Sequence, residues 1–439
     1  MDGHDSDPYE DDSSSGDERS SDSSSFDEDD YWLAKVLMVK ENDPEKTMLV
    51  ESGDHNYVRN ITDDGWEELG RDVSSNTHLE TVALCSGALN DQKLSCFFRG
   101  LTESSSLREM HLYDNGLSVA AVRSMVPFLQ NANSLNKLTV SHNNLQSGGL
   151  NLLFRTLRNS PIETLSCNNC GIESIDIDID SIPQNLKALN LSGNRMSADG
   201  YRGLAKLLQG GNSILATLRL NNNDIGDQGV EILVDALQSN KSLDTLELCE
   251  NRSISNQGRI MLLKLVNNVS TIKATLQSNH KLTDVKLKED RWTSPDTEIE
   301  RHIIMATHIN SRNQSNPEAA GRKKVIETQL NSEKRAALAN LQGVNHSLYS
   351  EINPLHLPEV LYLVGRYNHQ RELYIALRSS IAGVISIVNR KECLQQQRAY
   401  LRAKLEAVEA EISAIEAAEG HVDVVGIGSE SRSNKRRRA

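Results

Sequence analysis

Apolar and polar residues alternate in a regular order along the middle of the chain. Residues 215–237 read LATLRLNNNDIGDQGVEILVDAL. In the first half the leucines alternate, as they do on one side of a short strand, and Asn223 follows them in a turn. In the second half the inward positions are four residues apart, which is typical of one face of a helix: Gly229, Leu233 and Leu237. The segment therefore predicts a strand, a turn and a helix.

The same order returns along most of the chain. The units begin at Leu79, Leu107, Leu135, Ile162, Leu186, Leu215, Leu243 and Leu282. The steps between them are 24 to 29 residues, except the last, which is 39. One such unit cannot bury its own apolar face, so the units must stack on one another to form a core.

A column of small polar residues keeps the same phase as the leucines. It occupies the turn that follows each predicted strand: Asn115, Asn143, Cys170, Asn194, Asn223 and Asn251. A buried carboxamide there would satisfy backbone groups of a tight turn, and its loss would cost about 1 to 3 kcal/mol. We interpret this column as structural.

A period of about 28 residues leaves room for a strand, a turn and a full return helix. Over about residues 65–290 this pattern resembles the ribonuclease-inhibitor class of leucine-rich repeat proteins. That class also includes the Ran GTPase-activating protein and the sensor ends of many immune receptors. The resemblance implies an α/β fold, a right-handed leucine-rich-repeat solenoid (horseshoe) with a parallel concave sheet and convex helices, followed here by an α-helical C-terminal extension.

The resemblance also carries two expectations about function. The first is a non-enzymatic scaffold that binds a protein partner of unknown identity on the concave face. The alternative is a regulator of a small GTPase. In the Ran GTPase-activating protein the acidic tail is C-terminal, whereas here it is N-terminal. The loop residues of that family are not assigned to positions in this sequence, so the match stays at the level of the class.

Composition divides the rest of the chain. Residues 1–30 hold 13 acidic residues against Arg19 alone, so most of the formal net charge of −14 lies there, and we expect a disordered, Ser-rich tail. The other expected segments are an N-terminal cap and degenerate first repeat (31–78), the repeats (79–290), a helical extension (291–389), a heptad helix (390–418) and a flexible basic tail (419–439).

Two segments depart from the repeat. In repeat four, residues 173–183 read ESIDIDIDSIP where a helix is expected, and this alternation predicts extended backbone. Near the C-terminus the apolar positions are four and three residues apart: Leu401, Leu405, Val408, Ile412 and Ile415. That spacing predicts a coiled-coil seam, so residues 390–418 offer a route to a homodimer.

The outward strand positions form the candidate binding surface. Binding hot spots favour Tyr and Arg, and this surface holds one aromatic residue and one central arginine. The candidate partner contacts are His111, Tyr113, Arg219, Asn221, Glu247, Lys286 and Lys288. The alternative is that they are ordinary solvated strand positions.

Motifs for catalysis are missing from the sequence: there is no P-loop, HExxH, nucleophile elbow or kinase signature. Cys167 and Cys170 form a CxxC, but they occupy an inward strand position and a turn position, and no second CxxC completes a zinc site. We therefore expect no catalytic residue, no metal and no cofactor.

The expected location is the cytoplasm, and the nucleus is an alternative. Six scattered cysteines favour a reducing compartment, and the acidic N-terminus does not resemble a signal peptide. We expect neither a membrane nor a nucleic acid as partner. The chain ends in a basic cluster that predicts either nuclear import or contact with the acidic tail: Lys435, Arg436, Arg437 and Arg438.

Overall fold

The computed structural model describes most of the chain between residues 28 and 344, and a short segment near the C-terminus. The described residues are 28–52, 58, 60–87, 89–176, 182–210, 213–288, 297–329, 332–344, 398–410 and 412–413. The predictions for residues 1–27, 177–181 and 345–397 and for the basic C-terminus lie outside them. The chain divides into two compact units: the first extends to Asn144 and includes 160–162, and the second comprises 145–159 and everything from Glu163 onward.

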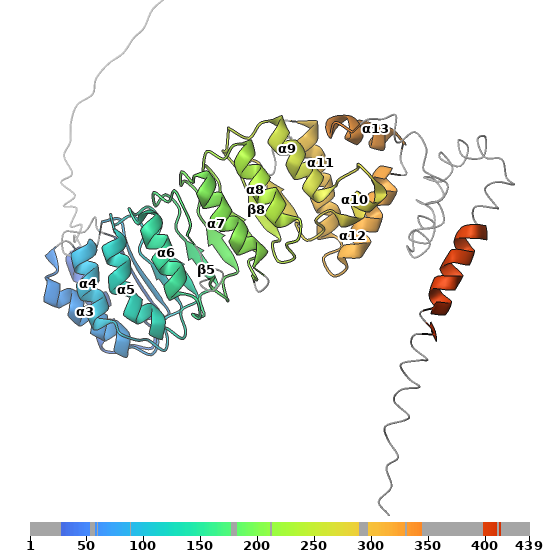
Figure 1. The fold of residues 1–439 in the computed structure, drawn as a ribbon. Helices are drawn as coiled ribbons and strands as arrows, with labels where there is room; N and C mark the ends of the chain where they lie inside the picture. The colour runs from blue at the N-terminus through green and yellow to red at the C-terminus, as the bar shows by residue number, and fades with distance from the viewer. Residues whose placement is uncertain are drawn as a thin grey trace, which may run out of the picture. The chain divides into compact units, whose positions relative to one another are not determined.

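The first unit is a parallel sheet with helices on one face (Figure 1). Its strands pair in chain order: β1 (Met48–Ser52), β2 (Thr81–Cys85), β3 (Glu109–His111) and β4 (Lys137–Thr139). The helices that follow the strands lie side by side: α3 (Asp63–Ser75), α4 (Asp91–Gly100) and α5 (Val119–Asn131). Helix α1 (Glu28–Lys40) packs against β1 and α3 and covers the N-terminal end of this unit.

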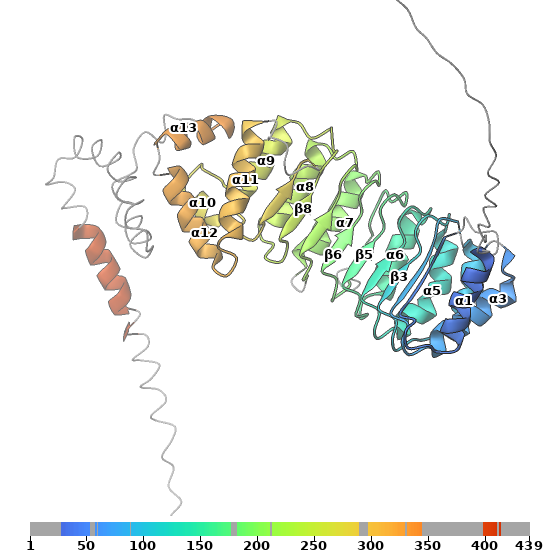
Figure 2. The same cartoon turned by 180° about the vertical axis from the view of Figure 1, so that it is seen from behind.

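The second unit repeats this plan and ends in additional helices (Figure 2). Its parallel strands are β5 (Thr164–Ser166), β6 (Ala188–Asn190), β7 (Thr217–Arg219), β8 (Thr245–Glu247) and β9 (Asp284–Lys286). Its repeat helices are α6 (Gln146–Thr156), α7 (Ala198–Gln209), α8 (Asp227–Leu237), α9 (Asn256–Val266) and the short α10 (Ile272–Gln277). The C-terminal helices are α11 (Glu298–Ser311), α12 (Pro317–Lys324), the π-helix η2 (Val325–Gln329) and α13 (Ser332–Leu341).

Each short strand buries its central apolar residue and leaves the two flanking positions more accessible. The central residues Met110, Leu138, Leu165, Leu189, Leu218 and Leu246 are fully buried. The inward helix positions are buried as well, for example Phe97 in α4 and Leu233 in α8. The predicted α/β fold of parallel strands with returning helices is confirmed in both units.

The turn carboxamides bind backbone groups of their own turn and of the preceding repeat. In the second unit the side-chain oxygen of Asn251 accepts hydrogen bonds from the amides of Asn223 (2.8 Å) and Ile225 (3.0 Å). Its nitrogen donates to the carbonyls of Leu220 (2.8 Å) and Leu248 (2.9 Å). Asn143 makes the corresponding bonds to the turn of Asn115 in the first unit, and Asn194 accepts from the amide of Cys170 in the second. A carboxamide serves here because it donates and accepts at once.

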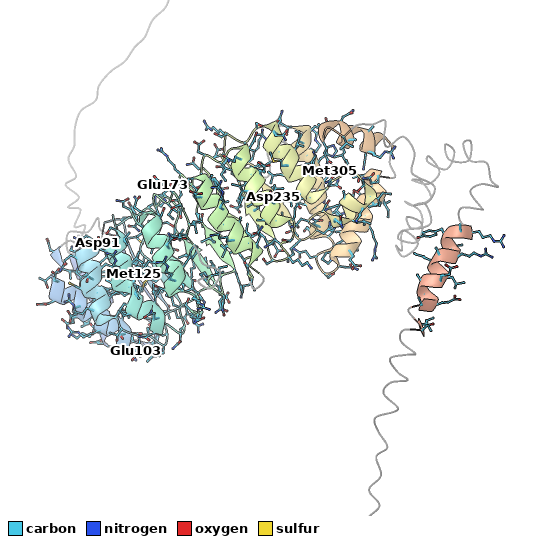
Figure 3. The ribbon with its side chains drawn as sticks, viewed as in Figure 1. Asp91, Glu103, Met125, Glu173, Asp235 and Met305 are labelled. Carbon is cyan, nitrogen blue, oxygen red and sulfur yellow. The ribbon has the colours of Figure 1, made fainter. Side chains whose placement is uncertain are left out.

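The helix side of the repeats is joined by a second set of polar contacts. The first residue of α4, Asp91 (Figure 3), accepts hydrogen bonds from the amide and the hydroxyl of Ser118, which caps α5. Asp227 at the start of α8 accepts the same pair from Ser255, the cap of α9. These contacts hold α4 and α5, and α8 and α9, in register at their N-termini.

The C-terminal helices cover the last repeat through buried polar contacts. Helix α11 packs along α9 and β9, and α12 along α10. The Asn310 side chain donates to the carbonyls of Asn279 and Leu282, and that of Gln342 donates to Asn267. An open repeat stack needs a cap that covers the apolar face of its last repeat. The C-terminal helices provide this cap.

Candidate functional site

The exposed face of the strands in the second unit carries a row of polar side chains. Because strand side chains alternate in direction, residues in register and two apart share one face. Asn190, Arg219, Glu247 and Lys286 are in register on β6 to β9. Three of these four residues are candidates from the sequence, and the strand pairing brings them side by side.

Glu247 lies at the centre of this row. Its carboxylate is 2.6 Å from the Lys286 ammonium and 3.2 Å from Nε of Arg219. The Glu247 side chain is only 10% exposed, whereas that of Arg219 is 43% exposed. The anion is therefore covered, and the arginine beside it faces the solvent.

The charge state of Glu247 follows from its neighbours. Burial would raise the pKa of this carboxyl group, but hydrogen bonds from Lys286 and Asn221 and the charge of Arg219 hold the pKa below its ordinary value. Glu247 therefore stays ionised near neutral pH. The three charged groups Arg219, Glu247 and Lys286 therefore sum to +1, and Asp284, two residues before Lys286 on β9, lies on the same face.

Asn221 positions the cluster. Its Nδ2 donates to Glu247 (3.2 Å), and its Oδ1 accepts from the backbone amide of Cys249 (2.9 Å). Both ends of the side chain are therefore engaged, and Asn221 fixes the carboxylate instead of reaching into solvent. The sequence placed Asn221 among partner contacts, and the structure gives it this supporting geometry.

A shallow groove continues from the cluster toward the C-terminal helices. Lys286 and Lys288 line it on the β9 side, and Ile304 and His308 line it on the α11 side. Ile304 is 51% exposed, and its neighbour Met305 (Figure 3) is 41% exposed. Lys288 therefore belongs with the groove, and apolar surface lies next to the cations.

The first unit presents different chemistry on its strand face. Glu109 accepts from Lys137 (2.9 Å) and lies 3.1 Å from Nε2 of His111. The Lys137 hydrogen bond is the main reason that the pKa of Glu109 is low. Tyr113, two residues beyond His111, is 43% exposed. His111 and Tyr113 thus lie on one face, with His111 held by Glu109.

Sequence reasoning missed two residues of this face. Met48 and Val50 lie on β1, in register with Thr81 and Ala83, and are 52% and 46% exposed. The repeat to which β1 belongs lacks the leucine pattern, so its strand was not recognised. The usable signal was the short apolar run Met48–Val50, which is bounded by polar residues on both sides.

The cysteines of the repeats are buried. Cys167 and Cys170 are both fully buried, and burial raises the pKa of the Cys167 thiol well above its ordinary value. Burial likewise raises the pKa of Cys85 to about 11. Within the described ranges, no group of three or more His, Cys, Asp and Glu side chains is placed to hold a metal ion. Over the same ranges no helix combines the length and the apolar character needed to cross a bilayer.

The repeats are similar in sequence to those of known proteins. Residues 110–279 match the family model of the PRAME C-terminal domain. The mouse ribonuclease inhibitor is 25% identical over 199 residues, which cover 44% of this chain and 43% of that protein. The repeats are of the ribonuclease-inhibitor type. The predicted resemblance is therefore confirmed.

Further relatives share the repeats over part of their length. Human NACHT, LRR and PYD domains-containing protein 5 is 26% identical over 238 residues, covering 52% of this chain and 19% of the relative. Among solved structures, the leucine-rich repeat-containing protein LegL7 from Legionella pneumophila aligns with 62% of this chain and 94% of its own, at 17% identity and a TM-score of 0.39. The chain spans about 43% of the length of the ribonuclease inhibitors that it matches.

Proposed function

We propose that this ribonuclease-inhibitor-type repeat protein is a non-enzymatic scaffold that binds a protein partner on the strand face of its second unit. The contact centres on Arg219 and Lys286, and the complementary group is a carboxylate of an acidic segment of the partner. The observation that carries the proposal is the half-exposed Arg219 held in place by the covered Glu247.

The geometry of Arg219 favours a carboxylate. The ion pair with Glu247 uses Nε, which leaves the two terminal guanidinium nitrogens for a planar, bidentate acceptor. Glu247, which is itself held by Asn221, holds the Arg219 side chain before the partner arrives, so less conformational entropy is lost on binding. The adjacent cation Lys286 adds attraction that weakens as salt is raised.

The relatives support a protein as the partner. The ribonuclease inhibitors among them, by their name, act on another protein. Repeat proteins of this kind present extended surfaces that suit macromolecular contact. The mouse ribonuclease inhibitor is 25% identical over 44% of this chain, which supports a protein as the class of partner. Experiment must identify that protein.

The test compares Arg219→Ala with the wild-type chain. Proteins captured from the native cell by the full-length wild-type chain are quantified, and the affinity of each is then measured for the variant. A central arginine hot spot contributes about 2 kcal/mol, so we expect affinity to fall about 30-fold. Binding should also weaken between low and high salt for the wild type more than for the variant.

Arg202→Ala is the matched control. Arg202 lies on helix α7, is 58% exposed on its side chain and pairs with one carboxylate, Asp199. This variant removes the same charge from the helix side and should leave affinity unchanged. Equal binding by Arg219→Ala and wild type, with both chains folded, would contradict the proposal.

Regulation of a small GTPase stays a hypothesis at the level of class. The direct assay is GTP hydrolysis by a panel of small GTPases with and without the full chain. Unchanged hydrolysis across the panel would dismiss this alternative and leave the scaffold proposal intact.

A further inference from the structure

The helix near the C-terminus exposes a continuous apolar stripe. Residues 398–410 and 412–413 are helical. Four large apolar side chains along it are about half exposed: Leu401 (57%), Leu405 (58%), Val408 (50%) and Ile412 (49%). None of the described parts of the chain covers them, and a single helix of this length is only marginally stable in water. We therefore expect these apolar side chains to be buried against another segment.

The spacing of the stripe specifies the kind of occupant. Intervals of four, three and four residues place Leu401 and Val408 at heptad position d and Leu405 and Ile412 at position a. A seam this narrow fits a second helix of the same period better than it fits a broad globular core. A second copy of this chain supplies such a helix.

Charges flank the seam asymmetrically. Its N-terminal half carries Arg402 at position e and Lys404 at position g, whereas the C-terminal half carries Glu409 at e and Glu411 at g. Arg398 adds a further cation at the N-terminal end of the seam. The helix is therefore basic at one end and acidic at the other.

This asymmetry distinguishes the two orientations of a dimer. A parallel pair aligns like halves, so Arg398 at position a faces its own copy, and Glu411 faces Glu416 of the second chain. Only the Lys404–Glu409 contacts are favourable in that arrangement. An antiparallel pair instead places each basic half against an acidic half, with Arg402 beside Glu409 and Lys404 beside Glu411. The twofold axis repeats both contacts, and no like charges meet.

We propose that residues 398–413 pair with a second copy of this chain as an antiparallel coiled coil. In the register that places the opposite charges together, Leu401 packs against Ile412 of the second copy, and Leu405 packs against Val408. Each interface position then occurs twice, as a twofold dimer requires. This inference is independent of the proposed function, because it uses neither the strand face nor its charges.

Cysteine cross-linking of the full-length protein tests orientation and register together. Cys393 is first replaced by serine, and the described cysteines of the repeats are buried and do not compete. Leu401→Cys and Ile412→Cys chains, differing in tag size, are then mixed and mildly oxidised. The antiparallel register predicts a disulfide between unlike chains, because Leu401 lies level with Ile412 of the second copy.

Two results would contradict the antiparallel dimer. Two copies of residue 401 lie about 16 Å apart along the axis of the antiparallel pair, too far for a disulfide. Disulfides between like chains at 401 would show a parallel dimer and overturn the orientation. A monomer in sedimentation at tens of micromolar, with no cross-link, would overturn the dimer.

Charge reversal provides a second readout that does not depend on cysteine. Arg402→Glu with Lys404→Glu places acidic groups against the acidic half of the second copy, so we expect dimer affinity to fall at least tenfold. Adding Glu409→Lys and Glu411→Lys to the same chain should restore it. Glu406→Lys, at position b away from the seam, is the control and should leave the dimer unchanged. If the variant with all four substitutions does not regain the dimer affinity of the wild type, the proposed charge pairing is contradicted.

Discussion

Lys324 is a lysine that solvent does not reach. It lies at the end of α12, is fully buried, and donates to the carbonyl of Val266 at 2.5 Å. Nδ1 of His280 is 3.2 Å away, and Nε2 of that ring is 3.1 Å from the carbonyl of Leu276. These partners assign the ring proton to Nε2 and leave Nδ1 to accept from the lysine.

Burial lowers the pKa of Lys324 to about 7, and it lowers the pKa of His280 to about 4. His280 is therefore neutral above pH 6, and Lys324 changes charge near neutral pH. The unfolded chain keeps this lysine protonated up to about pH 10. Between pH 7 and that value the unfolded state binds more protons than the folded state, so stability rises with pH.

We predict that the free energy of unfolding rises by about 1.5 kcal/mol between pH 7 and pH 8.5 through Lys324. Lys324→Met removes the titrating group and keeps most of the volume, so this rise should disappear in the variant. Urea unfolding of both chains at several pH values gives the difference. Identical pH profiles for the two chains would show that Lys324 does not titrate in the folded state in this range.

The buried polar residues mark what the sequence could not reveal at this scale. The turn asparagines were placed by their spacing, because a column in phase with the leucines reports one structural position. Lys324 and Gln342 have no such column. In a helix without a strong apolar face a lysine or glutamine is most often solvated, so only the packing of the C-terminal helices identifies these two as buried.

Helices α3 and α4 approach each other through glycine. A Cβ added at Gly70 would overlap the carbonyl oxygen of Phe97, and a Cβ added at Gly100 would overlap that of Glu67. Neither glycine has a positive φ, so close packing and not backbone conformation requires them. Edge-to-face contact of Trp66 with Phe97 fills the space beside them.

We predict that Gly70→Ala destabilises the protein by about 1 to 3 kcal/mol, although the same change in an open helix stabilises. The obstacle is backbone, which cannot move aside as a flexible side chain can. Gly226→Ser is the comparison. Gly226 is the N-cap residue of α8, and a Cβ added there meets nothing closer than 3.9 Å. Serine occupies the same cap position in α7 and α9. Thermal unfolding should show a lower Tm for the first variant and an equal or higher Tm for the second. Equal Tm values for Gly70→Ala and wild type would contradict the close contact.

Elements with a full repeat pattern were predictable, and elements without one were not. The strands from β2 onward follow the alternating leucines. Strand β1 was missed because its repeat lacks the leucine pattern and carries the apolar residues Met48 and Val50 at exposed positions. Helix α10 was also missed, since the 39-residue step before Leu282 gave no sign of how the added residues fold.

Two surfaces of the whole molecule take partners in this account, and each has its own evidence. The strand face of the second unit has a preorganised cation pair, and the C-terminal helix has an unpaired apolar seam. A dimer through the helix would carry two copies of the strand face. A partner with more than one acidic segment would then bind more tightly by avidity, without any new contact.

The sequence supported the class of fold and the candidate face better than the binding chemistry. Arg219 and Glu247 were identified only as outward positions. Their difference in exposure depends on the register of β7 to β9 and on the contact of Asn221 with Glu247. These contacts join residues of different repeats, so the pattern of one repeat does not reveal them. The apolar contribution of Ile304 and Met305 depends on how α11 packs beside β9, and the sequence gave no signal for that contact.

Site-specific photo-cross-linking in the native cell tests the binding face most directly. A photoreactive residue replaces Asn190, which lies beside Arg219 in register, or Asp235, which is exposed on helix α8 (Figure 3). The account predicts that the chain labelled at 190 forms a covalent adduct with a protein partner and that the chain labelled at 235 does not. Adducts at 235 alone would contradict it, because the partner would then lie on the helices.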